Sequence, residues 1–168
     1  MSPSEQELRG LAEQLGDCLM AKGMKLASAE SCTGGWLAKI ITDIPGSSAW
    51  FSGSVVSYSN ETKQSLLGVS ADTLAEHGAV SGDTVLAMSD GLFARTDADV
   101  AVSISGIAGP GGGSEAKPVG LVWLSWGKRD KSVLSNPYQF DGDREDVRKQ
   151  SVKQALDNLL DLLGCLQD

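Results

Sequence analysis

The stretch MKLASAESCTGGWLAKIITDI, residues 24–44, has the pattern of a strand, a turn and a helix. Residues 24–30 form a short segment typical of a strand. Gly34 and Gly35 then lead into residues 36–44, an apolar segment that stops before a proline, where a helix is expected to end. This order predicts a turn that carries small polar side chains from a strand to the start of a helix.

The rest of the chain continues the alternation of strands and helices. A helix is expected between a cap at Ser4 and a stop at Gly23. Further on, the pattern predicts a strand at 52–59, helices at 60–67, 71–77 and 81–98, strands at 99–106, 119–127 and 132–140, and a long amphipathic helix at 143–164. Such an order predicts one α/β domain over residues 1–168, a three-layer α/β/α sandwich whose mixed sheet has an antiparallel pair late in the chain.

Composition narrows the class of protein. Hydrophobic residues make up 41% and charged residues 21%, which is normal for a globular protein. The formal net charge of −8 argues against nucleic acid or an anionic membrane as a partner. Cys18, Cys32 and Cys165 are odd in number and widely spaced, which suggests neither a zinc site nor a disulfide framework. Because the N-terminus also lacks a signal-peptide pattern, we expect a reducing, cytoplasmic setting.

Ser31 stands in a turn that could support a nucleophile. Free N–H groups and the positive end of a helix dipole stabilise an oxyanion there. On spacing alone, however, Ser31 and Thr33 fit the commoner role of helix caps. The one histidine, His77, fits the last turn of a helix, where a cation is favoured for structural reasons. A nucleophilic serine would then need a lysine as base, and Lys39 and Lys63 are the nearest candidates, provided that burial or a neighbouring cation lowers the pKa.

Two further stretches have the composition of a ligand site. In SISGIAGPGGGSE, residues 103–115, glycines after an apolar strand allow close approach, and successive N–H groups can bind an anion. A mobile surface loop is the alternative. In FDGDREDVR, residues 140–148, Arg144 opposes the dipole of the helix that it begins. It forms either a salt bridge with a neighbouring carboxylate or a clamp on a phosphate.

The order of these motifs resembles a known family. AESCTGG, HGAVS, SISGIAGPGGG, KPVGLVW and FDGDREDVR follow one another as in the CinA C-terminal domain family, and the resemblance extends from residue 5 to residue 162. It is strongest with the members that consist of this domain alone. It implies an α/β/α amidase that needs no metal or cofactor. The implied reaction is hydrolysis of the carboxamide of nicotinamide mononucleotide to nicotinic acid mononucleotide and ammonia.

The resemblance also implies roles for individual residues. Ser31 matches the nucleophile, and Tyr58 and Lys63 match its activating partners. The family often has threonine where this chain has Ser105, which keeps the hydroxyl. The expected substrate-binding residues are Thr33, Gly34, Ser48, Ser105, Gly109, Gly111, Gly112 and Arg144. Thr33 and Gly34 would supply N–H groups to the oxyanion, and Arg144 with the glycines would hold the phosphate.

The expected partners are a small-molecule nucleotide and a second copy of the chain, most simply in a dimer, with no nucleic acid and no membrane. Two other readings stay open. One is a regulatory domain that binds a pyridine nucleotide without turnover. The other is an amidase or ester hydrolase that uses Ser31 and Lys63 on a different substrate.

Overall fold

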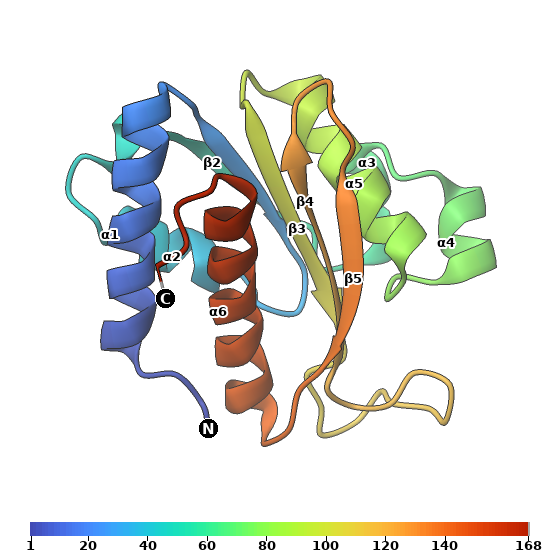
Figure 1. The fold of residues 1–168 in the computed structure, drawn as a ribbon. Coiled ribbons are helices and arrows are strands. Elements are labelled where there is room, and N and C mark those ends of the chain that lie inside the picture. The colour runs from blue at the N-terminus through green and yellow to red at the C-terminus, as the bar shows by residue number, and fades with distance from the viewer. Residues whose placement is uncertain (168) are drawn as a thin grey trace.

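The computed structural model describes residues 1–167 and has a five-stranded sheet at its centre (Figure 1). The sheet order is β2-β1-β3-β4-β5. β1 is parallel to β2 and to β3, whereas β4 is antiparallel to β3 and to β5. The predicted mixed sheet with a late antiparallel pair is therefore confirmed. The strands are β1 (Leu26–Glu30), β2 (Phe51–Val56), β3 (Val100–Gly106), β4 (Leu121–Lys128) and β5 (Leu134–Gln139).

Helices lie on both faces of this sheet, which confirms the three-layer α/β/α architecture (Figure 1). One face is covered by α1 (Glu5–Lys22), α2 (Trp36–Thr42) and α6 (Arg144–Leu162). The other face carries α3 (Asn60–Leu67), α4 (Ala71–His77) and α5 (Gly82–Arg95), with α4 outermost. A single 3-10 turn, η1 (Ser47–Ala49), leads into β2. Each helical layer has its own apolar core against the sheet.

A glycine in α5 sets the position of α3. Gly91 lies in the middle of α5, where glycine costs about 1 kcal/mol relative to alanine. A Cβ atom at this position would overlap the carbonyl oxygen of Leu67, at the end of α3. The missing side chain therefore allows α3 to pack tightly on α5, and α3 is the helix that carries Lys63.

The parallel strands bring three chain segments to one edge of the sheet. Glu30 at the end of β1 pairs with Val56 of β2 and with Ile104 of β3. The residues that follow these strands therefore meet at the same carboxyl edge, which is where open α/β sheets commonly bind ligands. This edge receives the turn after β1, the segment after β2 and the loop of residues 107–120 after β3, which we call the glycine-rich loop.

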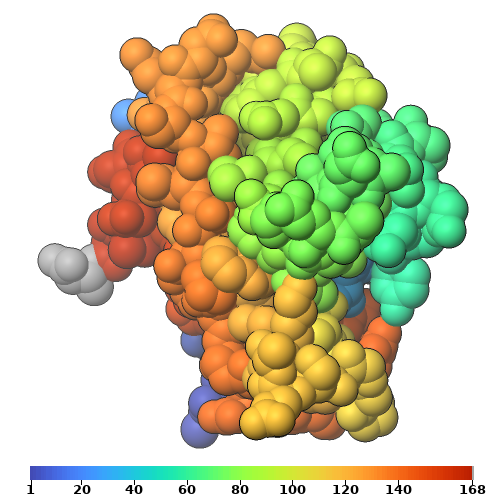
Figure 2. All heavy atoms as spheres, turned by 90° about the vertical axis from the view of Figure 1, so that its right-hand side faces the viewer, coloured from blue at the N-terminus to red at the C-terminus, as the bar shows by residue number. Residues whose placement is uncertain are grey.

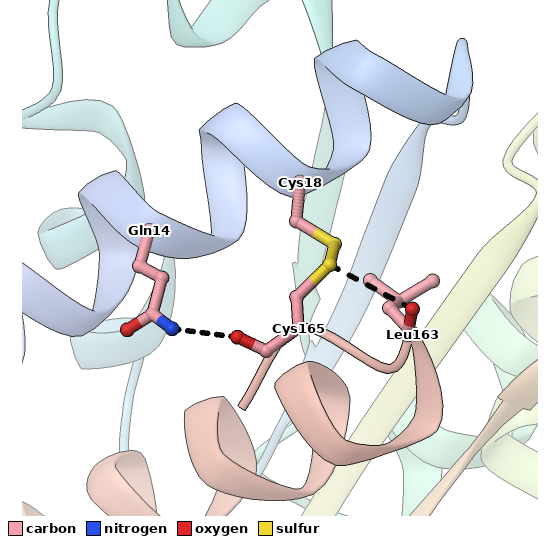
Figure 3. The surroundings of a disulfide bond; sticks show 4 residues. All are labelled: Gln14, Cys18, Leu163 and Cys165. Carbon is pink, nitrogen blue, oxygen red and sulfur yellow. Dashed lines mark hydrogen bonds between the residues drawn. A yellow bond between two sulfur atoms is a disulfide. The ribbon is translucent and has the colours of Figure 1, made fainter. Parts of the chain in front are cut away.

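Cys18 of α1 and Cys165 after α6 form a disulfide, with Cα atoms 6.3 Å apart (Figure 3). The side chain of Gln14 also donates a hydrogen bond to the Cys165 carbonyl, at 2.6 Å. The prediction that the cysteines form no disulfide is wrong, because the fold brings together two residues that are 147 positions apart. The cysteine pattern therefore no longer supports the expected reducing setting. None of the described helices combines the length and apolar character of a membrane span.

Breaking this disulfide should destabilise the fold. The chain-entropy argument gives about 5 kcal/mol for a crosslink that closes a loop of this length. We expect a reductant to lower the thermal midpoint of the wild-type protein. Cys165→Ser should lower it similarly and should not respond to reductant. Thermal unfolding followed by circular dichroism measures both, with a thiol count before each scan. A wild-type midpoint that is unchanged after complete reduction would contradict the prediction.

Candidate active site

The turn at residues 31–35, which we call the nucleophile turn, connects β1 to α2. Gly34 and Gly35 have φ values of +62° and +98°, a region that side chains other than glycine rarely adopt. The backbone N–H of Ser31 donates to the carbonyl of Ile104 at 2.9 Å, and that of Gly34 donates to the carbonyl of Ser31 at 3.0 Å. These bonds fix Ser31 to the sheet edge, with 7% of its surface exposed.

Glu30 organises the turn from the inside. Its carboxylate is fully buried and accepts bonds from Thr33 Oγ1 at 2.7 Å and from the N–H groups of Leu37 and Ala38 at 3.0 Å each. The cap of α2 is thus a carboxylate from the preceding strand, since Gly35 at the N-cap position has no side chain to offer. Neither Ser31 nor Thr33 caps the helix, so the cap alternative for Ser31 is excluded.

Lys63 lies against Ser31. Its Nζ is 2.9 Å from Ser31 Oγ and donates to the Ser57 carbonyl at 2.7 Å, with the Tyr58 carbonyl at 3.5 Å. All of these acceptors are uncharged, and only 1% of the Lys63 surface is exposed. Burial lowers the pKa of Lys63 from 10.5 to about 8, because it penalises the ammonium form. A large fraction of the amine is therefore neutral in mildly alkaline solution, where it can accept the proton of a serine.

The other candidate groups are poorly suited to this chemistry. Burial raises the pKa of the Cys32 thiol to about 12, which keeps it protonated and weakly nucleophilic. Lys39 forms an ion pair with Asp43 at 2.8 Å, and its hydrogen bond to this carboxylate raises its pKa. His77 lies in the last turn of α4, with Nδ1 at 3.3 Å from Asp83. Of the two lysines that the sequence offered as a base, Lys63 is the one that lies against Ser31.

Arg144 and Tyr58 meet at the rim of the same site. Arg144 donates to the Tyr58 hydroxyl at 3.1 Å and to the Gly109 carbonyl at 2.8 Å. The alternative of a salt bridge is not realised, because both acceptors are uncharged. The Tyr58 side chain is 60% exposed, and its hydroxyl bonds Arg144, whereas only its carbonyl approaches Lys63. The structure therefore does not place this hydroxyl between Lys63 and Ser31.

A cavity of about 310 Å³ connects these groups. In Figure 2 the glycine-rich loop (gold) projects at the base of the molecule, below α4 and α5 (green). Lys117 attaches this loop to α4 by donating to the His77 carbonyl at 2.6 Å. The cavity is lined by Ser31, Cys32, Tyr58, Lys63, Ala79, Val80, Ser105, Gly106, Ile107, Ala108, Gly109, Gly111, Gly112 and Arg144.

The glycine-rich loop offers free donors to this cavity. Gly109 and Gly112 have φ values of +83° and +85°. Within residues 1–167, the N–H groups of Gly109, Gly111 and Gly112 donate to no protein acceptor. Ser105 differs, because its buried hydroxyl donates to the Ala79 carbonyl at 2.8 Å and so holds a cavity wall. The loop thus has the unpaired N–H groups that an anion needs.

Three predicted substrate-binding residues lie outside the cavity. The Gly34 N–H donates to the Ser31 carbonyl and is not available, and the Thr33 hydroxyl is bonded to Glu30. The Thr33 N–H, the group expected to hold the oxyanion, donates to no protein acceptor within residues 1–167. Ser48 is exposed in η1, before β2. Because β2 runs parallel to β1, η1 lies at the amino edge of the sheet, opposite the site. Within one chain, Ser48 therefore does not reach the substrate cavity.

Arg148 is a residue that the sequence reasoning missed. It follows Arg144 by one turn of α6, and it donates from Nε to the Cys32 carbonyl at 3.0 Å and from Nη2 to the Thr33 carbonyl at 3.2 Å. Its guanidinium also lies over the Trp36 ring, 5.1 Å from the centroid. The one-turn spacing from Arg144 was the available signal, since residues at this spacing share a helix face.

The comparisons agree with this architecture. The protein-family model described as CinA C-terminal domain matches residues 8–163 of this chain. The nicotinamide-nucleotide amidohydrolase PncC of Escherichia coli K12 is 51% identical over 156 residues, which cover 93% of this chain and 94% of that protein. The PncC protein of Pseudomonas putida is 52% identical over 152 residues, with 90% and 94% covered. The crystal structure of competence/damage inducible protein CihA from Agrobacterium tumefaciens has a TM-score of 0.90 at 40% identity and covers 96% of this chain and 98% of its own. The chain belongs to the CinA C-terminal domain family.

Proposed function

We propose that the chain hydrolyses the carboxamide of nicotinamide mononucleotide to nicotinic acid mononucleotide and ammonia. The observation that carries the proposal is the 2.9 Å contact between the buried Lys63 amine and the Ser31 hydroxyl. The substrate class comes from relatives of about half identity, over nearly the whole chain, that are named nicotinamide-nucleotide amidohydrolases.

In the first step, the neutral amine of Lys63 accepts the proton of Ser31. Oγ then bonds to the amide carbon, and the carbonyl electrons move to oxygen. The ammonium formed on Lys63 keeps the carbonyls of Ser57 and Tyr58 as acceptors. These carbonyls stabilise the charge at the moment when it appears, although burial disfavours it in the resting enzyme.

The oxyanion needs donors beside Ser31. Within residues 1–167, the N–H groups of Cys32 and Thr33 donate to no protein acceptor. We assign the oxyanion to this part of the turn, with the Gly34 N–H removed from the expected set. The Lys63 ammonium then protonates the leaving nitrogen, the C–N bond breaks and ammonia departs. Water attacks the acyl-enzyme and gives a proton to Lys63, which passes it to Ser31 Oγ as the acyl C–O bond breaks. The acid that is released then ionises to the carboxylate product.

The phosphate end of the substrate is assigned to Arg144 and the glycine-rich loop. Arg144 lines the cavity together with Gly109, Gly111 and Gly112, whose N–H groups donate to no protein acceptor within residues 1–167. This local set of donors can hold a dianion although the whole chain carries a net charge of −8. Because the Tyr58 hydroxyl bonds Arg144, we assign it to this end and not to proton transfer. The dimer, the cytoplasmic location and the single-domain boundary stay predictions.

Replacing Ser31 should abolish catalysis without loss of the fold. Ser31→Ala removes the atom that bonds to the amide carbon, so we expect ammonia release from nicotinamide mononucleotide to fall to the background rate. A coupled ammonia assay measures this, with circular dichroism to verify folding. Lys39→Ala, which removes an exposed lysine, is the control and should retain wild-type activity. Turnover by Ser31→Ala would exclude Ser31 as the nucleophile. A wild-type protein that binds the nucleotide without turnover would favour the regulatory domain.

The rate should follow the protonation of Lys63. Because its pKa is lowered from 10.5 to about 8, the amine is charged below that pH and neutral above it. We therefore expect kcat/KM to rise with pH and to level off above about pH 8. Lys63→Arg should be inactive throughout, since a guanidinium stays protonated. NMR titration of 13C-labelled lysines gives the pKa independently, and a Lys63 signal that titrates near 10.5 would refute the assignment.

Arg144→Ala should weaken binding of the phosphorylated substrate. Loss of a charge-assisted contact to phosphate should raise KM for nicotinamide mononucleotide roughly tenfold to a hundredfold, with little change in kcat. Nicotinamide riboside has no phosphate and is the matched control substrate, for which the variant should resemble the wild type. An equal loss with both substrates would place the phosphate elsewhere.

A further inference from the structure

Arg148 binds the nucleophile turn through two consecutive peptide groups. Its Nε reaches the Cys32 carbonyl at 3.0 Å and its Nη2 reaches the Thr33 carbonyl at 3.2 Å. The guanidinium is partly buried and is held in place by the Trp36 ring, at 5.1 Å. Both hydrogen bonds go to backbone oxygens, so its charge acts on the Cys32–Thr33 and Thr33–Gly34 peptide groups.

Because the peptide group is planar, this contact with a carbonyl also sets the direction of the N–H group of the next residue. In a trans peptide the C=O and the following N–H point in opposite directions. A Cys32 carbonyl that faces Arg148 therefore turns the N–H of Thr33 away from Arg148. In the same way, the Thr33 carbonyl turns the N–H of Gly34 away, and this N–H bonds the Ser31 carbonyl.

Arg148 and the substrate cavity lie on different sides of the turn. Ser31, Cys32 and Lys63 line the cavity of about 310 Å³, whereas Thr33, Gly34 and Arg148 line a separate surface pocket. The N–H of Thr33, which has no protein acceptor within residues 1–167, therefore points away from Arg148. A cation on the carbonyl also polarises the peptide group and strengthens its N–H as a donor.

We infer that Arg148 is a positioning residue: it orients the Cys32–Thr33 peptide so that the Thr33 N–H faces the oxyanion formed after attack by Ser31. This inference rests on the proposed function for the reaction that it serves. It assigns separate roles to the two arginines of α6, since Arg144 lines the cavity and Arg148 holds the turn from outside. It also predicts that loss of Arg148 lowers kcat, whereas loss of a contact to the bound substrate raises KM.

Arg148→Ala is the main test. Loss of an oriented oxyanion donor should lower kcat for nicotinamide mononucleotide by about tenfold to a hundredfold, with KM within about twofold. Arg144→Ala should show the opposite split. Arg148→Lys keeps the charge but has a shorter side chain without the planar fork of the guanidinium, so an intermediate kcat is expected. Methylguanidinium in solution should restore part of the activity of Arg148→Ala but not that of Arg144→Ala, because only the former leaves a half-buried guanidinium site beside a tryptophan.

A second readout does not depend on the substrate. An alkyl fluorophosphonate reacts when Ser31 Oγ bonds to phosphorus, Lys63 takes the proton and fluoride leaves, through a transition state with charge on the phosphoryl oxygen. Intact-mass spectrometry gives the rate of labelling. Arg148→Ala should slow the labelling of Ser31 by the same factor as kcat. Lys153→Ala, which removes a different positive charge of α6, should change neither rate.

The outcomes separate the two proposals. A wild type that labels in an Arg148-dependent way but releases no ammonia would sustain this inference and refute the proposed function. Wild-type turnover with unchanged kcat and labelling in Arg148→Ala would overturn the inference and leave the function intact. If Arg148→Ala does not fold, Arg148→Lys and Arg148→Gln decide: wild-type kcat in both would overturn it. A wild type that neither turns over nor labels would refute both.

Discussion

The site depends on keeping the Lys63 amine out of water. An ammonium group with 1% exposure is costly, and two features of the fold act in the same direction. Lys63 lies in the first turn of α3, which is capped by Ser59 with a reciprocal bond from Thr62, so the positive end of the helix dipole also disfavours a cation. Gly91 of α5 lets the other end of α3 approach closely. The packing of α3 is thus a requirement of the chemistry as well as of stability.

Helix α6 brings local positive charge to an acidic protein. Arg144 and Arg148 are one turn apart, yet their guanidinium groups serve different surfaces because one reaches the glycine-rich loop and the other reaches the nucleophile turn. A rotation or shift of α6 would move both together. The disulfide between α1 and the segment after α6 holds the far end of this pair of helices, so it restrains the helix that carries both arginines.

Local patterns were sufficient for the layer order and for the strand, turn and helix around Ser31. Lys63 followed from the scarcity of histidine and from the family resemblance. What local patterns could not give depends on which residues meet across the fold. The Cys18–Cys165 bond joins the two ends of the chain, and the position of Ser48 depends on the direction of β2. The cap of α2 comes from Glu30 in the preceding strand, which capping rules based on Ser, Thr, Asp or Asn do not anticipate.

Glu30 explains how a buried carboxylate and a neutral lysine coexist beside Ser31. A carboxylate paired with Lys63 would stabilise the ammonium form and raise its pKa, so the base would be lost. Both Glu30 oxygens are instead occupied by N–H and O–H donors of α2 and Thr33. Their partial positive charges balance the carboxylate where it stands. The bonds that cap α2 therefore also keep the negative charge of Glu30 away from Lys63, and the amine is left with only neutral acceptors.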